Sequence, residues 1–271
     1  MNREDSRQPR RALRGRLYPA ISLVLALVFA GGEAGAVETT VVVRAKAKDA
    51  MFIGSSFGGA RVIVRNAETG EILAQGLTEG GTGAPDVVMA ETISRGVTVT
   101  DARTARFKAV LNLNEPTLAT IEVVAPRSQG QAMIRASTQV WLIPGKELGV
   151  DGLILEIPGF AVDLLEPRAA GKIGLSDGKA TIPISANVVM MCGCPVTPGG
   201  LWDADRYEVG AMIFRNGDGI GTVPLTYAGE PSKFAGAVEV HSSGTYDLRV
   251  YAYDPRTGNT GVDRTVIRVV E

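Results

Sequence analysis

Apolar residues recur at every second position along most of this chain, and this period of two restricts the fold more than any other sequence feature. The longest example is the run 179–192, whose even positions are apolar from Ala180 to Cys192, whereas Thr181, Ser185 and Asn187 are polar. Because side chains alternate between the two faces of a β-strand, the even positions are expected to face a core. After residue 36, no window longer than about ten residues sustains the apolar stripe of a helix. The sequence predicts an all-β protein.

Short β-branched runs bounded by turn residues form two groups along the chain. The first group comprises 40–45, 60–65, 105–111, 119–124 and 136–143, and the second comprises about seven runs between 153 and 270. Between them, residues 144–152 lack alternation and are rich in glycine, with a proline at their start. We therefore expect two consecutive β-sandwich domains, at about 37–144 and 150–271.

Two segments resemble known families. Residues 59–76 resemble the opening hairpin of transthyretin-like, carboxypeptidase-regulatory-type domains, in which a Thr-Gly turn, here Thr69-Gly70, joins two strands. Residues 244–261 are similar to the last two strands of bacterial immunoglobulin-like domains, with Tyr246 placed as a tyrosine corner that ties down the preceding loop. The resemblances imply a transthyretin-like sandwich at 37–144 and an immunoglobulin-like sandwich at 150–271, and neither implies a particular ligand.

Residues 1–36 have the pattern of a cleaved signal peptide. Six arginines precede an apolar run at 21–30, and Ala34-Gly35-Ala36 supplies small residues for cleavage. The apolar run is shorter than the roughly 20 residues of a membrane-spanning helix, so no stable span is expected after cleavage. Of the 28 basic and 29 acidic residues, 6 and 3 lie in this segment, which leaves 22 basic and 26 acidic residues and a net charge of −4. We expect a periplasmic or secreted protein, and this charge gives no reason to expect binding to nucleic acid.

Both cysteines of the chain lie in Met190-Met191-Cys192-Gly193-Cys194, at the end of the longest alternating run. Three hypotheses describe the chemical state of these two cysteines. A Cys192–Cys194 disulfide fits an exported protein, and its small ring is expected to be strained. A soft-metal site, with both thiolates and a thioether from Met190 or Met191, suits monovalent copper. Redox exchange or a mixed disulfide with a partner is the third hypothesis, although the usual Cys-x-x-Cys signature is missing.

The residues expected around the sulfur atoms come from two loops at the same end of the second sandwich, in an immunoglobulin-like strand order. They lie in 195–206 and 254–261, and they are Trp202, Asp203, Asp205, Asp254, Arg256 and Asn259. Alternation places the sulfur pair at an exposed rim in this reading. His241, the only histidine, ends the run 234–240 and is expected at the opposite end.

The function expected from these features is noncatalytic. The main hypothesis is an exported binding or accessory protein for an unknown protein or small ligand in the cell envelope, with copper at Cys192, Cys194, Met190 and Met191 as its sharper form. The first alternative is a structural or adhesion module in which the cysteines fasten a loop. The second alternative, a hydrolase, requires a pocket around His241, and no Gly-x-Ser-x-Gly motif supports it.

Overall fold

A computed structural model describes residues 35–271 except 91 and 93, and Gly35–Glu271 forms one compact unit. The predicted signal peptide therefore lies, apart from its last two residues, outside the described residues. The prediction of an all-β fold is confirmed, because strands dominate and the helices of the described residues are single turns. These short helices are η1 (Ser55–Phe57), α1 (Pro85–Val88), η2 (Gly130–Ala132) and η3 (Ala204–Arg206).

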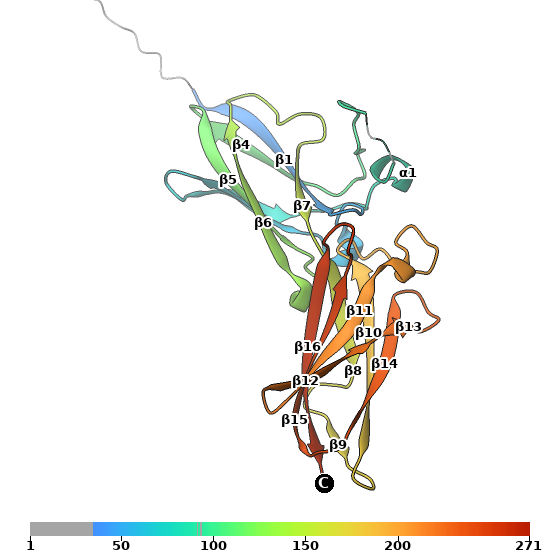
Figure 1. Ribbon diagram of the computed structural model, residues 1–271. Helices are drawn as coiled ribbons and strands as arrows, with labels where there is room; N and C mark the ends of the chain where they lie inside the picture. The colour runs from blue at the N-terminus through green and yellow to red at the C-terminus, as the bar shows by residue number, and fades with distance from the viewer. Residues whose placement is uncertain (1–34, 91, 93) are drawn as a thin grey trace, which may run out of the picture. The chain divides into compact units, whose positions relative to one another are not determined.

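The N-terminal part, residues 37–157, contains two sheets (Figure 1). One sheet has the order β4-β1-β7, with β4 (Phe107–Leu113) antiparallel and β7 (Leu153–Ile157) parallel to β1 (Val37–Ala47). The other has the antiparallel order β3-β2-β5-β6, formed by β2 (Arg61–Asn66), β3 (Ile72–Leu77), β5 (Thr117–Ala125) and β6 (Ile134–Leu142). Alternate residues of β1 and β5 are buried, including Val41, Val43, Ile121 and Val123, so the inner faces of both sheets contribute to one core.

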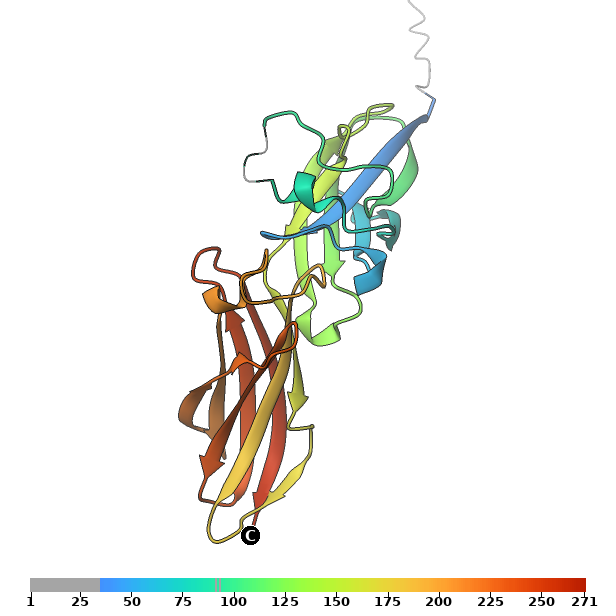
Figure 2. The same ribbon diagram turned by 90° about the vertical axis from the view of Figure 1, so that its right-hand side faces the viewer.

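The C-terminal part, residues 160–270, is a sandwich of a four-stranded and a five-stranded sheet (Figure 2). The order β13-β14-β10-β8 contains β8 (Phe160–Glu166), β10 (Ala180–Met190), β13 (Thr226–Tyr227) and β14 (Lys233–Val240). The order β12-β11-β15-β16-β9 contains β9 (Lys172–Gly174), β11 (Glu208–Arg215), β12 (Asp218–Pro224), β15 (Gly244–Tyr253) and β16 (Thr260–Val270). These orders correspond to strands D-E-B-A and C′-C-F-G-A′ of an immunoglobulin-like sandwich.

Local features of both parts confirm the sequence reading. The even positions of β10 from Ala180 to Met190 are buried, as alternation predicts. The hairpin β11–β12 turns at Asn216-Gly217, where both residues have positive φ, and β2–β3 turns through Gly70, also at positive φ. Tyr246 is buried and its hydroxyl donates to the Ser242 carbonyl oxygen at 2.8 Å, which is the expected tyrosine corner.

One strand is placed differently from the expectation. Residues 153–157 were expected to open the second group of strands, but they form β7 and pair with Val43–Ala47 of β1 in the N-terminal part. A run of four apolar residues and one glutamate has no signal that selects one sheet over another. The division into domains at 37–144 and 150–271, and the transthyretin-like family of the first, stay predictions.

Candidate functional site

The loop that follows β10, residues 191–207, carries both cysteines, and they are joined in a disulfide. A tight turn closes it, because the Gly193 amide donates to the Met190 carbonyl at 2.7 Å and the Met190 amide donates to the Cys194 carbonyl at 3.1 Å. Gly193 has a φ of +79°, in the left-handed region that favours glycine. Cys192 is buried and Cys194 is half-buried, while Met190 and Met191 are fully buried in the core.

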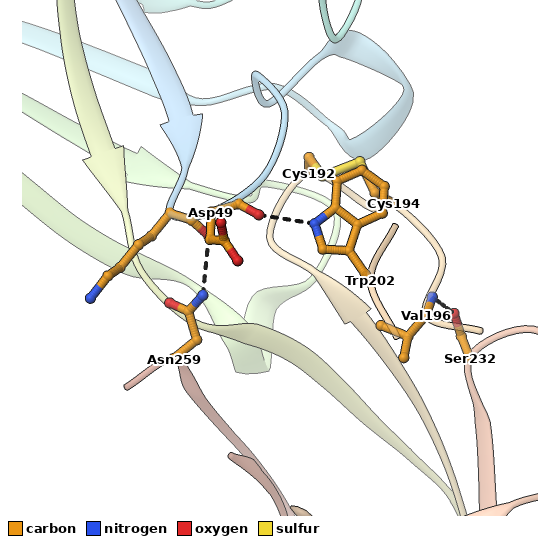
Figure 3. The surroundings of a disulfide bond; sticks show 8 residues. Asp49, Cys192, Cys194, Val196, Trp202, Ser232 and Asn259 are labelled. Carbon is orange, nitrogen blue, oxygen red and sulfur yellow. Dashed lines mark hydrogen bonds between the residues drawn. A yellow bond between two sulfur atoms is a disulfide. The ribbon is translucent and has the colours of Figure 1, made fainter. Parts of the chain in front are cut away.

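The expectation of an exposed rim is wrong for this loop, because the N-terminal part packs on it (Figure 3). The indole nitrogen of Trp202 donates to the Asp49 carbonyl oxygen at 2.9 Å, and the Trp202 side chain is buried. The Gly193 backbone lies against the ring of Phe57, since a Cβ at Gly193 would be 2.7 Å from Phe57 Cδ2. The disulfide-closed loop therefore contacts two residues that precede it by more than a hundred positions.

The neighbouring loop between β15 and β16, residues 254–259, binds the same turn of the N-terminal part. The Asn259 amide nitrogen donates to the Lys48 carbonyl at 3.1 Å, and its side-chain oxygen accepts from the Gly159 amide at 2.8 Å. In return, Lys48 Nζ donates to the Thr257 carbonyl at 2.7 Å. Asn259 is completely buried, so both ends of its side-chain amide are satisfied by protein groups.

Buried hydrogen bonds hold this loop in shape. Asp254 is completely buried, and its carboxylate accepts from the Arg256 amide at 2.9 Å and from the Thr257 hydroxyl at 2.7 Å. Burial, followed by the nearby charge of Asp254, raises the pKa of Tyr207 to about 12. The Tyr207 ring packs edge-on against Phe160, with the ring centres 4.9 Å apart. We use the name junction for the contacts of residues 47–58 with the loops 191–207 and 254–259.

The six residues expected around the sulfur atoms have different roles. Trp202 and Asn259 bind the N-terminal part, and Asp254 shapes its own loop. Asp203 accepts from the Gly199 and Asp205 amides and begins η3, and Asp205 is exposed. Arg256 lies 4.0 Å from the Asp49 carboxylate and 3.9 Å from that of Asp254.

His241 lies at the opposite end of the sandwich from the cysteines, as expected. β10 and β14 are antiparallel with Ala180 opposite Val240, so His241 follows the end of β14 that is far from Cys192. Its side chain is exposed and lies 3.5 Å from Glu239. The hydrolase hypothesis, which requires a pocket around His241, stays a prediction.

A metal site requires several ligands close together in space. The described residues contain no group of three or more His, Cys, Asp or Glu side chains arranged to hold a metal ion. In the disulfide, neither sulfur is a thiolate, which is the ligand form of cysteine. Copper binding by Cys192, Cys194, Met190 and Met191 therefore stays a prediction that applies to the reduced loop.

The junction was missed at the level of sequence, although one signal for it exists. Trp202 stands in a loop otherwise rich in glycine, proline and aspartate. A large aromatic side chain in such a loop is a signal that the loop packs against another part of the protein. Nothing in the sequence identifies Asp49 or Phe57 as its partners. Across residues 35–271 outside the two gaps, no helix combines the length and apolarity of a membrane span.

No protein-family model matches the chain, and no curated protein matches it. Among solved structures, an engineered protein shares 15% identity over 44% of this chain and 22% of its own length, with a TM-score of 0.28. The FN1–FN3 domains of chicken CNTN1 share 13% identity over 87% of this chain and 62% of theirs, with a TM-score of 0.24. The CupB6 tip adhesin from Pseudomonas aeruginosa shares 11% identity over 89% of this chain and 86% of its own, with a TM-score of 0.16.

The chain covers less than two thirds of the length of the first two structures. TM-scores of this size carry no argument about fold or function. The description of the C-terminal part as immunoglobulin-like therefore rests on its own strand order and tyrosine corner.

Proposed function

We propose that this chain is an exported, noncatalytic module of the cell envelope or cell exterior, with a binding or adhesion role, in which the Cys192–Cys194 loop fastens the two β parts together. The observation that carries the proposal is the packing of the disulfide-closed loop on Asp49 and Phe57. The proposal favours the structural role of the cysteines over an exposed site for a ligand. Export itself rests on the pattern of residues 1–36 and on the disulfide.

The disulfide supports the junction through the shape of one turn. It fixes the backbone at Gly193, which lies against Phe57, and Cys192 adds to the core beside Met190. Trp202, ten residues after Cys192, donates from its indole nitrogen to the Asp49 carbonyl oxygen. Because the loop binds at both places, an unfastened turn at 192–194 is expected to loosen the Trp202 contact as well.

The test replaces both cysteines by serine. Closing a three-residue ring removes about 1.6 kcal/mol of chain entropy from the unfolded state. We expect the double variant Cys192→Ser/Cys194→Ser to lose stability of this order in urea unfolding, and to be cleaved faster by trypsin after Arg206 within the loop. Arg215, at the opposite end of the sandwich, is the control site, and its cleavage rate should not change. Equal rates at Arg206 in both proteins would overturn the fastening role.

Copper binding is a more specific version of the binding hypothesis. It is suggested by four sulfur-bearing residues within five positions, Met190, Met191, Cys192 and Cys194. It is tested on protein whose disulfide has been reduced, titrated with monovalent copper under anaerobic conditions. One equivalent bound by the reduced wild type and none by the double serine variant would support it. No stoichiometric copper on the reduced wild type would overturn copper binding.

A further inference from the structure

The outward face of β16 combines cations and exposed apolar side chains in strict alternation. Its inward residues Thr265, Ile267 and Val269 are buried. Its outward residues are all exposed, and they are Val262, Arg264, Val266, Arg268 and Val270. The three valines are 53%, 36% and 38% exposed, and they share one face of a single strand with the two arginines. We call these five residues the Val/Arg stripe.

The stripe presents positive charge. Asp247, the carboxylate beside it, is mostly covered by two guanidinium groups: Arg264 Nε lies 2.7 Å from one oxygen and Arg249 Nη2 lies 2.9 Å from the other. Burial raises the pKa of Asp247. The hydrogen bonds from Arg264 and Arg249 together lower this pKa by more than burial raises it, so it falls below its usual value. Arg264 and Arg249 remain about half exposed, and Arg268 has no ion-pair partner among the described residues.

The stripe also lies in a hollowed surface. A groove of about 580 Å³ is lined by Ala169, Ala170, Arg264, Val266 and Arg268, and its walls are mainly apolar. A second groove of about 530 Å³ continues past Arg268 to Val270 and Glu271, and shares Thr245 and Arg268 with the first. The backbone of the 168–171 turn is fixed beside β16, because the Ala170 amide donates to the Val266 carbonyl and the Arg268 amide donates to the Gly171 carbonyl, both at 2.9 Å.

Exposed arginines beside apolar side chains are the composition of protein interfaces, where arginine is enriched and aspartate and glutamate are depleted. Along a strand, Arg264 and Arg268 are separated by about 13 Å, with Val266 midway. In an extended peptide placed along the groove, the side chains that point toward the sheet also recur at every second residue, with the same spacing as those of the strand. Carboxylates at its first and fifth positions then meet the two arginines, and an apolar side chain at its third position meets Val266.

We propose that the Val/Arg stripe docks an extended segment of a partner protein that carries acidic residues four positions apart with an apolar residue between them. Charge complementarity selects this occupant. The net charge of −4 on residues 37–271 opposes a general polyanion as the ligand, because a polyanion is repelled by the rest of the surface. The inference deepens the proposed binding role, but it does not depend on the junction.

The test measures fluorescence anisotropy of a fluorescein-labelled peptide, Gly-Asp-Thr-Val-Thr-Asp-Gly, with the full chain lacking residues 1–36, at low salt. We expect binding that weakens about tenfold in Arg268→Ala and in Arg264→Ala, since one charge-assisted hydrogen bond contributes about 1.5 kcal/mol. The matched control is Arg135→Ala, an exposed arginine on β6 whose loss should change nothing. Arg268→Ala is the cleaner variant, because Arg264 also holds Asp247.

Three kinds of result would overturn the proposal. The first is equal affinity for a peptide with both aspartates replaced by asparagine, or no binding up to about 1 mM peptide, the range of weak complexes. The second is displacement of the peptide by heparin that binds through Arg264 and Arg268, which would indicate a polyanion site. The third is a dimer of the chain in sedimentation that depends on Arg268, which would indicate a second copy as the occupant. None of these results alters trypsin cleavage at Arg206, so failure here is distinguishable from failure of the junction role.

Discussion

The contact of Gly193 with Phe57 offers the most direct test of the junction. In Gly193→Ala, the new methyl group meets two separate costs. The left-handed backbone at φ +79° costs a non-glycine residue about 1–2 kcal/mol. The methyl group would also lie 2.7 Å from Phe57 Cδ2, and such overpacking costs about 1–3 kcal/mol. Together they predict a loss of about 2–5 kcal/mol in the free energy of unfolding.

A matched control separates the two costs within the same loop. Gly199 also has a positive φ, +67°, but no atom lies within 4 Å of the position of its Cβ. Gly199→Ala is therefore expected to lose only the backbone part, about 1–2 kcal/mol. In a Phe57→Ala background, Gly193→Ala should fall to the same value, because the clash has been removed.

The assay is urea unfolding followed by tryptophan fluorescence, applied to both single variants and the double variant. The double-mutant cycle should give a coupling between Gly193 and Phe57 of about 1–3 kcal/mol. If Gly193→Ala and Gly199→Ala cost the same, and the cost at Gly193 is unchanged by Phe57→Ala, the two parts of the chain do not meet at this turn and the reasoning is refuted.

Three further predictions concern single side chains. Trp202→Phe removes the hydrogen bond to Asp49 and also part of the buried aromatic volume, so urea unfolding should show a loss of more than about 1 kcal/mol; no loss would contradict the contact. Tyr246→Phe removes the bond to the Ser242 carbonyl and should lose a similar amount in the same assay, whereas Tyr227→Phe, whose hydroxyl makes no hydrogen bond in the described part of the chain, should not. For Asp247→Asn the effect should depend on pH: the folded pKa is lowered, so its stabilisation is present above the unfolded pKa near 4 and is lost as pH falls through the folded pKa. Unfolding at a series of pH values from about 6 to about 2 should show wild type and variant converging, and a constant difference would contradict this.

The sequence predicted those features that depend on neighbouring residues. Alternation from Ala180 to Met190 predicts which face of β10 is buried. The pair Asn216-Gly217 predicts a tight turn, because only a few residue types adopt the positive φ that the turn requires. Tyr246 was identified from the resemblance of its strand to immunoglobulin-like domains, and its hydroxyl reaches only four residues back, to Ser242. Each of these interactions is completed within a short stretch of chain.

The junction was not predicted, because its contacts are distant in sequence. Alternation shows that Cys192 continues a buried row, but it does not show what covers the end of the sandwich. Trp202 and Asp49 are separated by 153 positions, and the group that accepts the hydrogen bond is a backbone carbonyl, which every residue has. The placement of β7 beside β1 was missed for a related reason, since a parallel pair leaves no turn signal between its strands.

The burial of Asn259 has a consequence for how this protein can vary or be engineered. In antibodies, the loops at this end of the sandwich tolerate changes in length and sequence because they face solvent. Here an inserted residue between Asp254 and Asn259 would move an amide that bridges Lys48 and Gly159, so tags and grafted epitopes should fail there. The turns around Asp177 and Asn216, at the far end, face solvent and are the places where foreign sequence should be accepted.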